Sequence, residues 1–196
     1  MSFKSDRKRD LILRSAEKVF IRKGFSSVTM KDIIDECGIS RGGIYLYYSS
    51  VDHVFIDVIK AHNQTKLECI KDDIEDQTDF ETLLDQYFSM QKLRLTHMED
   101  SLLLAMLEFY ISHKQMVDVE FFSSTYGSLG NVITEVLNCG VKHGYIKEGD
   151  VKVLAEHLQY CIKGVEVLAI SSGINEEQLE QQFCYMKKMI IDQKGR

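Results

Sequence analysis

The sequence contains no proline and no tryptophan among its 196 residues. Proline is the residue that most often breaks a helix, so its absence leaves helices uninterrupted along the chain. Apolar residues make up 44% of the sequence, which is enough for one domain and a smaller appended one. We therefore expect an all-α protein.

Cysteines are few, and none of them belongs to a C-x-x-C pair. The five are scattered at Cys37, Cys69, Cys139, Cys161 and Cys184. This pattern is typical of reduced, mostly buried cysteines in a cytoplasmic protein, and it leaves open whether any of them is redox-active. No apolar run approaches the length of about 18 residues that a membrane span needs, and no signal-peptide core opens the chain. We predict neither membrane insertion nor export.

Catalytic and metal-binding motifs are also missing. No two of the six histidines stand three or four residues apart, and the chain has no H-E-x-x-H, P-loop, G-x-G-x-x-G or G-x-S-x-G motif. We predict no metal, no cofactor and no enzymatic activity. Two alternatives stay open: an enzyme whose residues are scattered over a helical scaffold, and a helical protein-interaction module.

Charge is unevenly divided along the chain. Residues 1–48 hold ten Lys/Arg against six Asp/Glu, a net charge of +4, and residues 49–196 hold fourteen against twenty-four, a net charge of −10. A small basic head on an acidic body suits a specific DNA-binding protein that avoids coating DNA non-specifically. Ordinary solvated surface charge would give the same numbers.

The stretch from residue 29 to residue 48 has the pattern of a helix-turn-helix. Apolar residues at i, i+3, i+4 and i+7 predict its first helix, with Met30, Ile33, Ile34 and Cys37 on one face. Thr29 is placed to cap this helix and Gly38 to end it in the left-handed conformation, while Ser40 can cap the next helix. Two helices joined so closely must cross steeply.

The predicted second helix, residues 41–48, carries Gly42 and Gly43 in its first turn. Each glycine costs about 1 kcal/mol of helix propensity relative to alanine, which marks a candidate functional site. Without side chains, the backbone there could lie close to a phosphate or a groove floor. Ile44 and Tyr48, at i and i+4, should face inward. Three side chains with donors or planar rings then point outward: Arg41, Tyr45 and Tyr47.

The sequence from residue 38 reads Gly-Ile-Ser-Arg-Gly-Gly-Ile-Tyr-Leu-Tyr-Tyr, followed by Ser49-Ser50 and Asp52. It resembles the signature of the TetR family of one-component transcriptional regulators. That signature runs Gly, apolar, Ser, basic, Gly, small, apolar, Tyr, aromatic, Tyr or His, Phe, then a polar turn and an acidic start to a long helix. Two positions depart from it. Leu46 stands where an aromatic residue is frequent, and Val51 stands where many members carry a lysine that holds a phosphate.

The resemblance implies a set of DNA-binding residues in the head. Thr29 and Lys31 would approach the duplex from the first helix of the motif; Ser40, Arg41, Gly42 and Gly43 would meet the major groove, with Tyr45, Tyr47 and Ser49 on phosphates. Arg41 is the favoured guanine reader, because its guanidinium can donate two hydrogen bonds to O6 and N7. Lys31 is the second choice.

The resemblance and the helical patterns together predict two domains and about nine helices. Residues 1–48 would form the three-helix DNA-binding domain, and residues 49–196 a helical domain for ligand binding and dimerisation. Helices are expected near residues 6–23, 30–37, 41–48, 51–74, 79–94, 97–113, 117–143, 150–171 and 176–193.

We expect a homodimer formed by the last two helices. One short recognition helix covers only a few base pairs, so a specific site calls for a second copy about 34–36 Å away on a palindromic operator. The last helix spreads its apolar side chains more widely than one stripe: Phe183, Tyr185, Met186, Met189, Ile190 and Ile191. These residues could instead complete the core of a monomer.

The body is expected to sense a small, largely apolar effector that releases the protein from DNA, as the family resemblance implies. Aromatic and methionine side chains gather on the helices that would surround a cavity: Tyr87, Met90, Met106, Phe109, Tyr110, Phe122 and Tyr126. Such residues suit an apolar or flat ligand, although a stripe of this kind is equally compatible with plain core.

Overall fold

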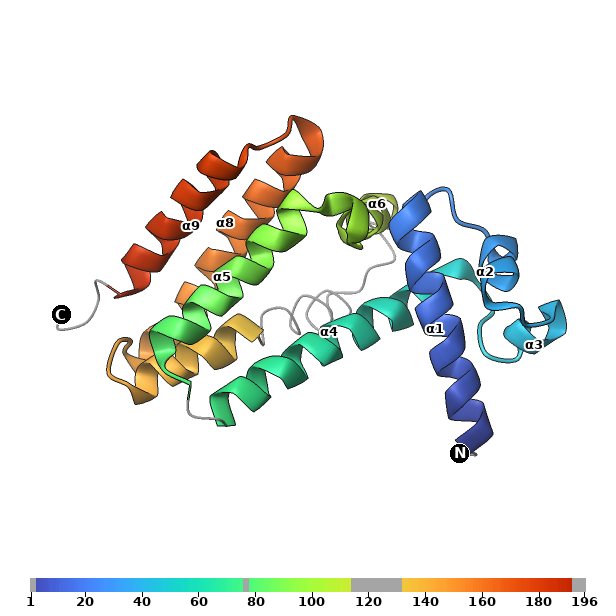
Figure 1. Ribbon diagram of the computed structural model, residues 1–196, viewed down its shortest axis with the longest axis horizontal. Helices are drawn as coiled ribbons and strands as arrows, with labels where there is room; N and C mark the ends of the chain where they lie inside the picture. Colours follow the sequence, from blue (N-terminus) through green and yellow to red (C-terminus); the bar gives the residue numbers. More distant parts are fainter. Residues whose placement is uncertain (1–2, 76–77, 114–131, 192–196) are drawn as a thin grey trace. The chain divides into compact units, whose positions relative to one another are not determined.

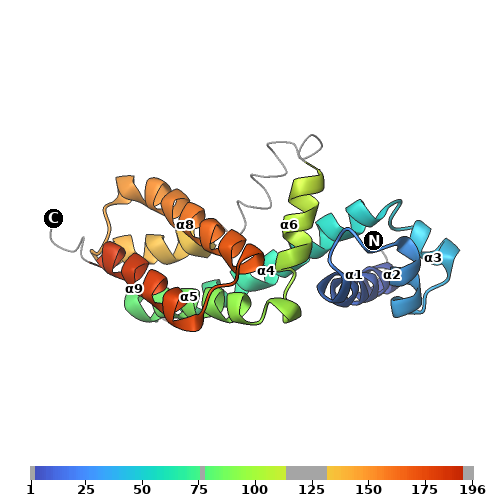
Figure 2. The same ribbon diagram turned by 90° about the horizontal axis from the view of Figure 1, so that it is seen from above.

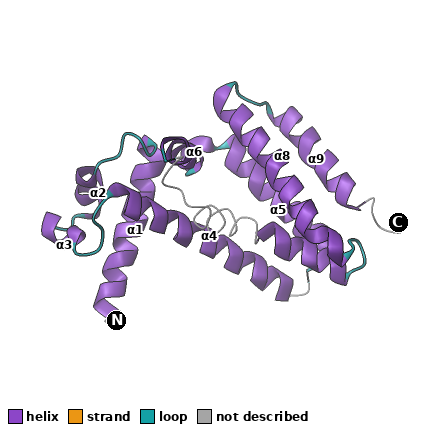
Figure 3. Cartoon of the chain, turned by 180° about the vertical axis from the view of Figure 1, so that it is seen from behind, coloured by secondary structure: helices purple, strands orange, loops and turns teal. Residues whose placement is uncertain are grey.

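The computed structural model describes residues 3–75, 78–113 and 132–191. In these ranges the chain forms helices, turns and loops, and no strand (Figure 3), so the all-α prediction is confirmed. The α-helices are α1 (Phe3–Lys23), α2 (Met30–Cys37), α3 (Arg41–Tyr45), α4 (Val51–Glu75), α5 (Phe80–Thr96), α6 (Leu103–Ser112), α8 (Val151–Ser171) and α9 (Glu176–Ile191), with a further helix over residues 132–142 (Figure 1). Short 3-10 helices stand at Met98–Asp100 and Glu148–Asp150.

Packing divides the chain into two compact units. Unit 1 holds Met1–Asn63 and Met98–Phe122, and unit 2 holds Gln64–His97 and Ser123–Arg196. Unit 1 thus includes α6 and the first half of α4 besides α1, α2 and α3. The boundary expected between residues 48 and 49 divides a DNA-binding domain from a ligand-binding domain, which is a division by function and not by packing. It stays a prediction.

The core of unit 1 is built on α1 and the first half of α4. The predicted inner face of α1 is fully buried, with Ile12, Ala16, Val19 and Phe20 all at 0% exposure. Four aromatic rings meet beside it, including Phe20 and Phe55 with centroids 4.6 Å apart, and Phe25 and Phe109 with centroids 4.9 Å apart. Each such pair contributes about 0.5–1.5 kcal/mol beyond its buried area. The cluster joins α1, α4 and α6. Helix α2 packs against α1, and α3 packs against α2.

The corner between α1 and α2 is held by a carboxylate from α6. Oε2 of Glu108 accepts a hydrogen bond of 2.8 Å from the backbone N–H of Ser26. Gly24, which ends α1 with φ of +72°, lies directly under this carboxylate, and a Cβ there would stand 2.7 Å from the same oxygen. The left-handed turn therefore favours glycine at this position.

In unit 2, α5 packs along α9. The rings of Phe88 and Phe183 lie 5.4 Å apart between the two helices. Lys92 donates to Glu180 at 2.7 Å, and α8 runs beside α9 (Figures 1 and 2). Because exposed ion pairs are worth about 0–1 kcal/mol, the buried rings contribute more to this contact than the charges do.

Unit 2 also encloses a charged cluster between α5 and α8. The carboxylate of Glu166, only 5% exposed, accepts from Arg94 and, at 2.6 Å, from Lys163. Oε1 of Gln91 accepts a second bond from Arg94 at 2.7 Å. Although burial alone raises the pKa of Glu166, the two cations lower it below its ordinary value. The carboxylate therefore stays ionised inside the unit.

One helix start differs from the sequence prediction. The helix expected from residue 97 begins only at Leu103; Thr96 ends α5, and its hydroxyl donates back to the carbonyl of Lys92 at 3.0 Å. The start of α5 agrees with the prediction, since Asp79 caps it by accepting from the N–H of Thr82 at 3.1 Å. Within the described ranges, every helix is too short or too polar to cross a membrane.

Candidate nucleic-acid interface

The start of α2 is fixed by the predicted capping box. The hydroxyl of Thr29 accepts from the N–H of Asp32 at 3.3 Å, and the Asp32 carboxylate accepts from the N–H of Thr29 at 2.8 Å. Lys23 donates to the same carboxylate at 2.6 Å. The Lys23 ammonium, followed by the Thr29 hydroxyl, holds the pKa of Asp32 well below its usual range. Gly38 ends the helix at φ of +67°, as predicted.

Helix α3 ends at Tyr45, three residues before the predicted end, and together with the turn that follows it presents three rows of side chains at i, i+4 spacing. Its inner row, Ile44 and Tyr48, is 0% and 4% exposed, which confirms the inward direction predicted for both residues. On one outer row, the guanidinium of Arg41 lies 5.8 Å from the ring centroid of Tyr45. The other outer row holds Gly42 and Leu46. The hydroxyl of Ser40 caps the helix by accepting from the N–H of Gly43 at 3.3 Å.

The two adjacent glycines of α3 meet different surroundings. A Cβ on Gly42 would meet no atom within 4 Å, so its backbone is open to the outside. A Cβ on Gly43 would lie 2.8 Å from Cγ2 of Ile39 and 3.1 Å from the Ser40 hydroxyl. Packing therefore explains the glycine at position 43, whereas only Gly42 offers bare backbone to a partner.

Most residues implied in DNA binding lie on the surface of unit 1. Exposed are Thr29, Lys31, Ser40, Arg41, Gly42, Tyr45 and Ser49, while Gly43 and Tyr47 are half-buried. Three of the hydroxyls already have partners within the chain, since Ser49 Oγ lies 2.8 Å from Nδ1 of His53 and the other two cap helices. Contacts to DNA from these hydroxyls would have to share or replace those bonds.

An ionic network places α3 against α1 and α4. Arg9 donates to Asp57 at 2.6 Å and to the Tyr48 hydroxyl at 3.2 Å, and that hydroxyl donates to Asp57 at 3.1 Å. Asp57 and Tyr48 raise the pKa of Arg9 further, so its charge is permanent. Arg9 itself lies on α1.

Sequence reasoning missed one prominent residue of this surface. Leu46 is 85% exposed, next to Tyr45 at 43%. Its position four residues after Gly42 was the available signal, because that spacing places both on the same outer row of α3.

The residues predicted to line a ligand pocket fall in different parts of the chain. Tyr87 and Met90 lie on α5, and Met106, Phe109 and Tyr110 lie on α6, while Phe122 and Tyr126 lie outside the described residues. Tyr87, Met106 and Phe109 are buried, and Met90 and Tyr110 are half-buried. Phe109 packs against Phe25 in the aromatic cluster of unit 1. Whether any of them lines a pocket stays a prediction.

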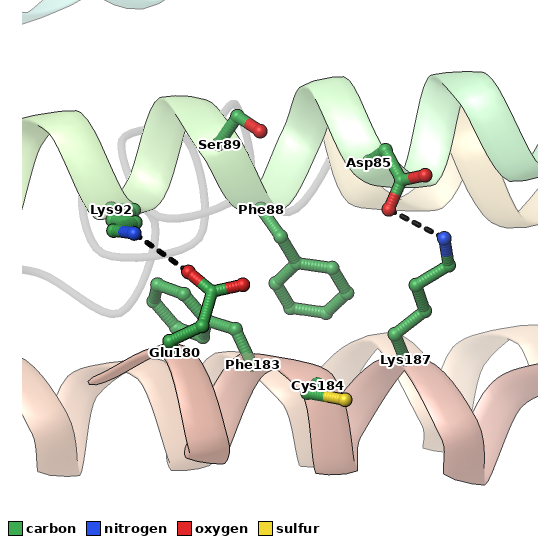
Figure 4. Close-up of a pocket in the computed structure, with 8 residues that line it drawn as sticks. All are labelled: Asp85, Phe88, Ser89, Lys92, Glu180, Phe183, Cys184 and Lys187. Carbon is green, nitrogen blue, oxygen red and sulfur yellow. Dashed lines mark hydrogen bonds and ion pairs between the residues drawn. The ribbon is translucent and has the colours of Figure 1, made fainter. Parts of the chain in front are cut away.

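Unit 2 contains a cleft of about 240 Å³ between α5 and α9 (Figure 4). It is lined by Asp85, Phe88, Ser89, Lys92, Glu180, Phe183, Cys184 and Lys187, none of which was predicted to bind a ligand. Figure 4 shows both ion pairs, Lys92 with Glu180 and Lys187 with Asp85, crossing from one helix to the other. The two phenylalanines between them are 6% and 4% exposed, so they contribute little to the solvent-exposed lining of the cleft.

Comparison with known proteins identifies the head. Residues 12–58 match the family model of bacterial regulatory proteins of the tetR family. The transcriptional regulator YfiR of Bacillus subtilis is 48% identical over 56 residues, 29% of this chain and 27% of that protein. QacR of Staphylococcus aureus is 21% identical over 183 residues, 86% of this chain and 89% of that protein. These descriptions name transcriptional regulators, in agreement with the prediction that the chain is not an enzyme.

Solved structures show the same fold over the whole length. A TetR-family regulator of Mesorhizobium loti has a TM-score of 0.72 at 18% identity, covering 97% of this chain and 98% of that one. FadR of Bacillus subtilis, solved in complex with stearoyl-CoA, has a TM-score of 0.66 at 17% identity, covering 94% and 98%. The chain therefore matches the tetR family over residues 12–58 and shares the fold of a TetR-family regulator along most of its length.

Proposed function

We propose that the protein is a repressor that binds a palindromic operator as a homodimer and leaves it when a small, largely apolar ligand binds. The observation that carries the DNA-binding part is the outer surface of α3. It combines a guanidinium at Arg41, the ring and hydroxyl of Tyr45 and the bare backbone of Gly42. Donors and planar groups around an open backbone suit the edge of a base pair in the major groove.

In this proposal Arg41 on α3 reads guanine, and Lys31 on α2 is the second reader. Arg41 is exposed and stands at the first position of α3, where no packing interaction of the core restrains its end. Tyr45, Tyr47 and Ser49 contact phosphates, which positions the duplex without reading its sequence. The inner row of α3, tied to Arg9 and Asp57, keeps this surface in a fixed orientation.

Selection from a pool of random duplexes tests the DNA-binding proposal. Pure protein is incubated with the pool at physiological salt, and the bound duplexes are amplified and sequenced. We expect a shared palindromic motif whose half-sites are about 10 base pairs apart, centre to centre. Duplexes without a common motif after repeated rounds would refute sequence-specific binding.

The homodimer is proposed to form through α8 and α9. Of the residues expected to mediate it, Phe183, Met186 and Ile190 are 4%, 6% and 0% exposed, so they pack inside unit 2. Exposed apolar side chains lie instead mainly along α8, with one on α9: Val153, Tyr160, Val167, Leu168 and Tyr185. A second copy of the same surface would bury them, as a self-complementary dimer contact does.

Light scattering at micromolar concentration tests the homodimer and should give twice the 22.6 kDa chain mass. A monomer mass would contradict the proposal.

The effector is proposed to be a largely apolar molecule held in the helical body. FadR, which shares the fold, was solved with stearoyl-CoA, a molecule with a long apolar chain. The body of the present chain offers buried aromatic and methionine side chains on α5 and α6, including Tyr87 and Met106. These support an apolar ligand without naming it.

Release from DNA requires that the ligand favour a conformation that binds the operator poorly. A 100-fold loss of operator affinity corresponds to about 2.7 kcal/mol of coupling. Helix α4 is continuous from unit 1 into unit 2, so we propose that it transmits the effect of the ligand to the DNA-binding head.

Linkage makes the test reciprocal, since operator DNA must weaken ligand binding by the same factor. Compounds that raise the melting temperature would be titrated with and without operator. Equal affinities would contradict the release mechanism.

A further inference from the structure

We propose that Leu46 reads the 5-methyl group of a thymine in each operator half-site. This inference rests on the proposed sequence-specific DNA binding and names a base contact that the resemblance does not supply. Leu46 is 85% exposed, the most exposed of the large apolar side chains in the described residues. It lies on the surface that also carries Arg41 and Tyr45.

The direction of Leu46 is fixed by the backbone. Its φ of −71° and ψ of −20° continue the helical path beyond Tyr45. The N–H groups of Tyr47 and Tyr48 both donate to the carbonyl of Ile44, at 2.9 and 3.0 Å, which closes the turn around Leu46. Because Ile44 and Tyr48 are buried on the opposite side, Leu46 is held outward on the Gly42 row.

The neighbour of Leu46 along this row has no side chain. Gly42 stands four residues earlier, and a Cβ there would meet nothing within 4 Å. The leucine therefore protrudes beside bare backbone and is not shielded by a longer side chain on its own row. The Gly42 row can therefore approach a groove closely, with Leu46 as its one projecting side chain beside Arg41 and Tyr45.

The chemistry of the groove selects one partner for such a side chain. Phosphate oxygens and most base edges lose hydrogen bonds to water when a leucine covers them, and a leucine returns none. The 5-methyl group of thymine is the apolar group that B-DNA presents in the major groove. Contact between that methyl group and Leu46 buries apolar surface on both sides without leaving a polar group unsatisfied.

Replacing thymine by uracil tests this contact, because uracil keeps the base pairing and removes only the methyl group. The probe is the duplex selected from the random pool, with uracil introduced at one symmetric pair of thymines at a time. For the wild-type protein we expect one pair to cost about 4-fold in affinity per half-site, the effect of one buried methylene-sized group. In the Leu46→Ala protein the same replacement should have no effect.

Two further variants separate this role from a general loss of apolar surface. Leu46→Gln keeps the size of the side chain and should also abolish the uracil effect. Leu93→Ala removes an exposed leucine of α5, 61% exposed, and should retain the full wild-type uracil effect. Circular dichroism melting checks that the exposed substitutions leave folding intact.

The outcomes distinguish the inference from the function on which it rests. If a motif is selected but uracil costs the same in the wild-type and Leu46→Ala proteins, or costs nothing in both, the methyl contact is refuted while DNA recognition stands. If no motif is selected, the proposed function itself fails, and the contact fails with it.

Discussion

Both units have exposed apolar side chains, but the residues beside these side chains differ between the two units. On α3, Leu46 and Tyr45 stand beside the guanidinium of Arg41 and the bare backbone of Gly42. On α8, the exposed residues Val153, Tyr160 and Val167 follow one another at seven-residue spacing, which places them along one side of the helix, two turns apart.

The difference supports the proposal that the first surface binds DNA and the second binds another copy of the chain. A DNA interface is polar and positively charged, with apolar contacts only where a base offers a methyl group. The core of a protein–protein interface is depleted of charge and enriched in aromatic residues. The head surface fits the first description and the α8 stripe fits the second, so substitutions in the two places should have separable effects.

The largest effect is expected from breaking the α8 stripe. Tyr160→Glu with Val167→Glu would place two charges in the proposed dimer contact, where they lose water without gaining a partner. Splitting the dimer removes the gain from binding two half-sites at once, so operator affinity should fall by about 100-fold or more. Light scattering and fluorescence anisotropy would report the mass and the affinity.

The control is Lys71→Glu, which adds negative charge at an exposed position of α4. It should leave both mass and operator affinity close to the wild-type values. A dimer that survives the double substitution on α8 would show that another surface joins the copies.

Arg41→Ala should have the next largest effect. Losing a two-bond contact to guanine costs about 1–3 kcal/mol, or about 5- to 150-fold in affinity, and relaxes the preference at one operator position. Anisotropy on duplexes that vary at each position would detect the change. Arg14→Ala, which removes an exposed charge of α1, should leave the order of preferred sequences unchanged. An Arg41→Ala protein with wild-type preferences would rule out this residue as the guanine reader.

The two glycines of α3 should separate stability from binding. A methyl group at position 43 would press on Ile39, so Gly43→Ala should destabilise the protein by about 1–3 kcal/mol. The methyl group of Gly42→Ala meets no neighbour. The variant should therefore keep the free energy of unfolding or raise it by up to about 1 kcal/mol, the difference in helix propensity, and its melting temperature should not fall. Its operator affinity should nevertheless fall, because the added methyl group stands between backbone and duplex. Equal melting temperatures for both variants would contradict this assignment.

The smallest effect is expected from Asp32→Asn. Its pKa is lowered in the folded protein from an ordinary value of 3.8, so the ionised carboxylate stabilises the fold above that pH. This contribution is lost as acid protonates the group. The variant should melt slightly lower at neutral pH and lose less stability on acidification, as thermal melts over a pH series would show. An unchanged acid dependence would mean that the Lys23 contact is not formed in solution.

Local features were predictable because neighbouring residues determine them. The Thr29–Asp32 box, the left-handed Gly38 and the Ser40 cap follow from residues at most three positions apart, and each is present. The helix expected from residue 97 was wrong for a related reason. Thr96 could cap a following helix or bond back to Lys92, and sequence alone did not decide between the two.

Contacts between distant segments could not be predicted in this way. The bond from Ser26 to Glu108 joins residues 82 positions apart, and Arg9 meets Asp57 over 48 positions. The exposure of Leu46 was missed for a different reason, since its spacing from Gly42 and the predicted inward direction of Ile44 and Tyr48 already placed it outward. The prediction that Phe183 and Met186 mediate a dimer left open that they complete the core, and only the packing of α5 against α9 shows that both are buried within unit 2.

One ratio tests sequence-specific recognition by α3 most directly. It compares the affinity for the selected palindrome with that for a scrambled duplex of the same composition, measured by anisotropy at physiological salt. We predict a ratio of about 1,000 or more, as specific DNA-binding proteins have, falling at least about 5-fold in the Arg41→Ala protein. A ratio near one would contradict the account, because binding would then depend on phosphates alone.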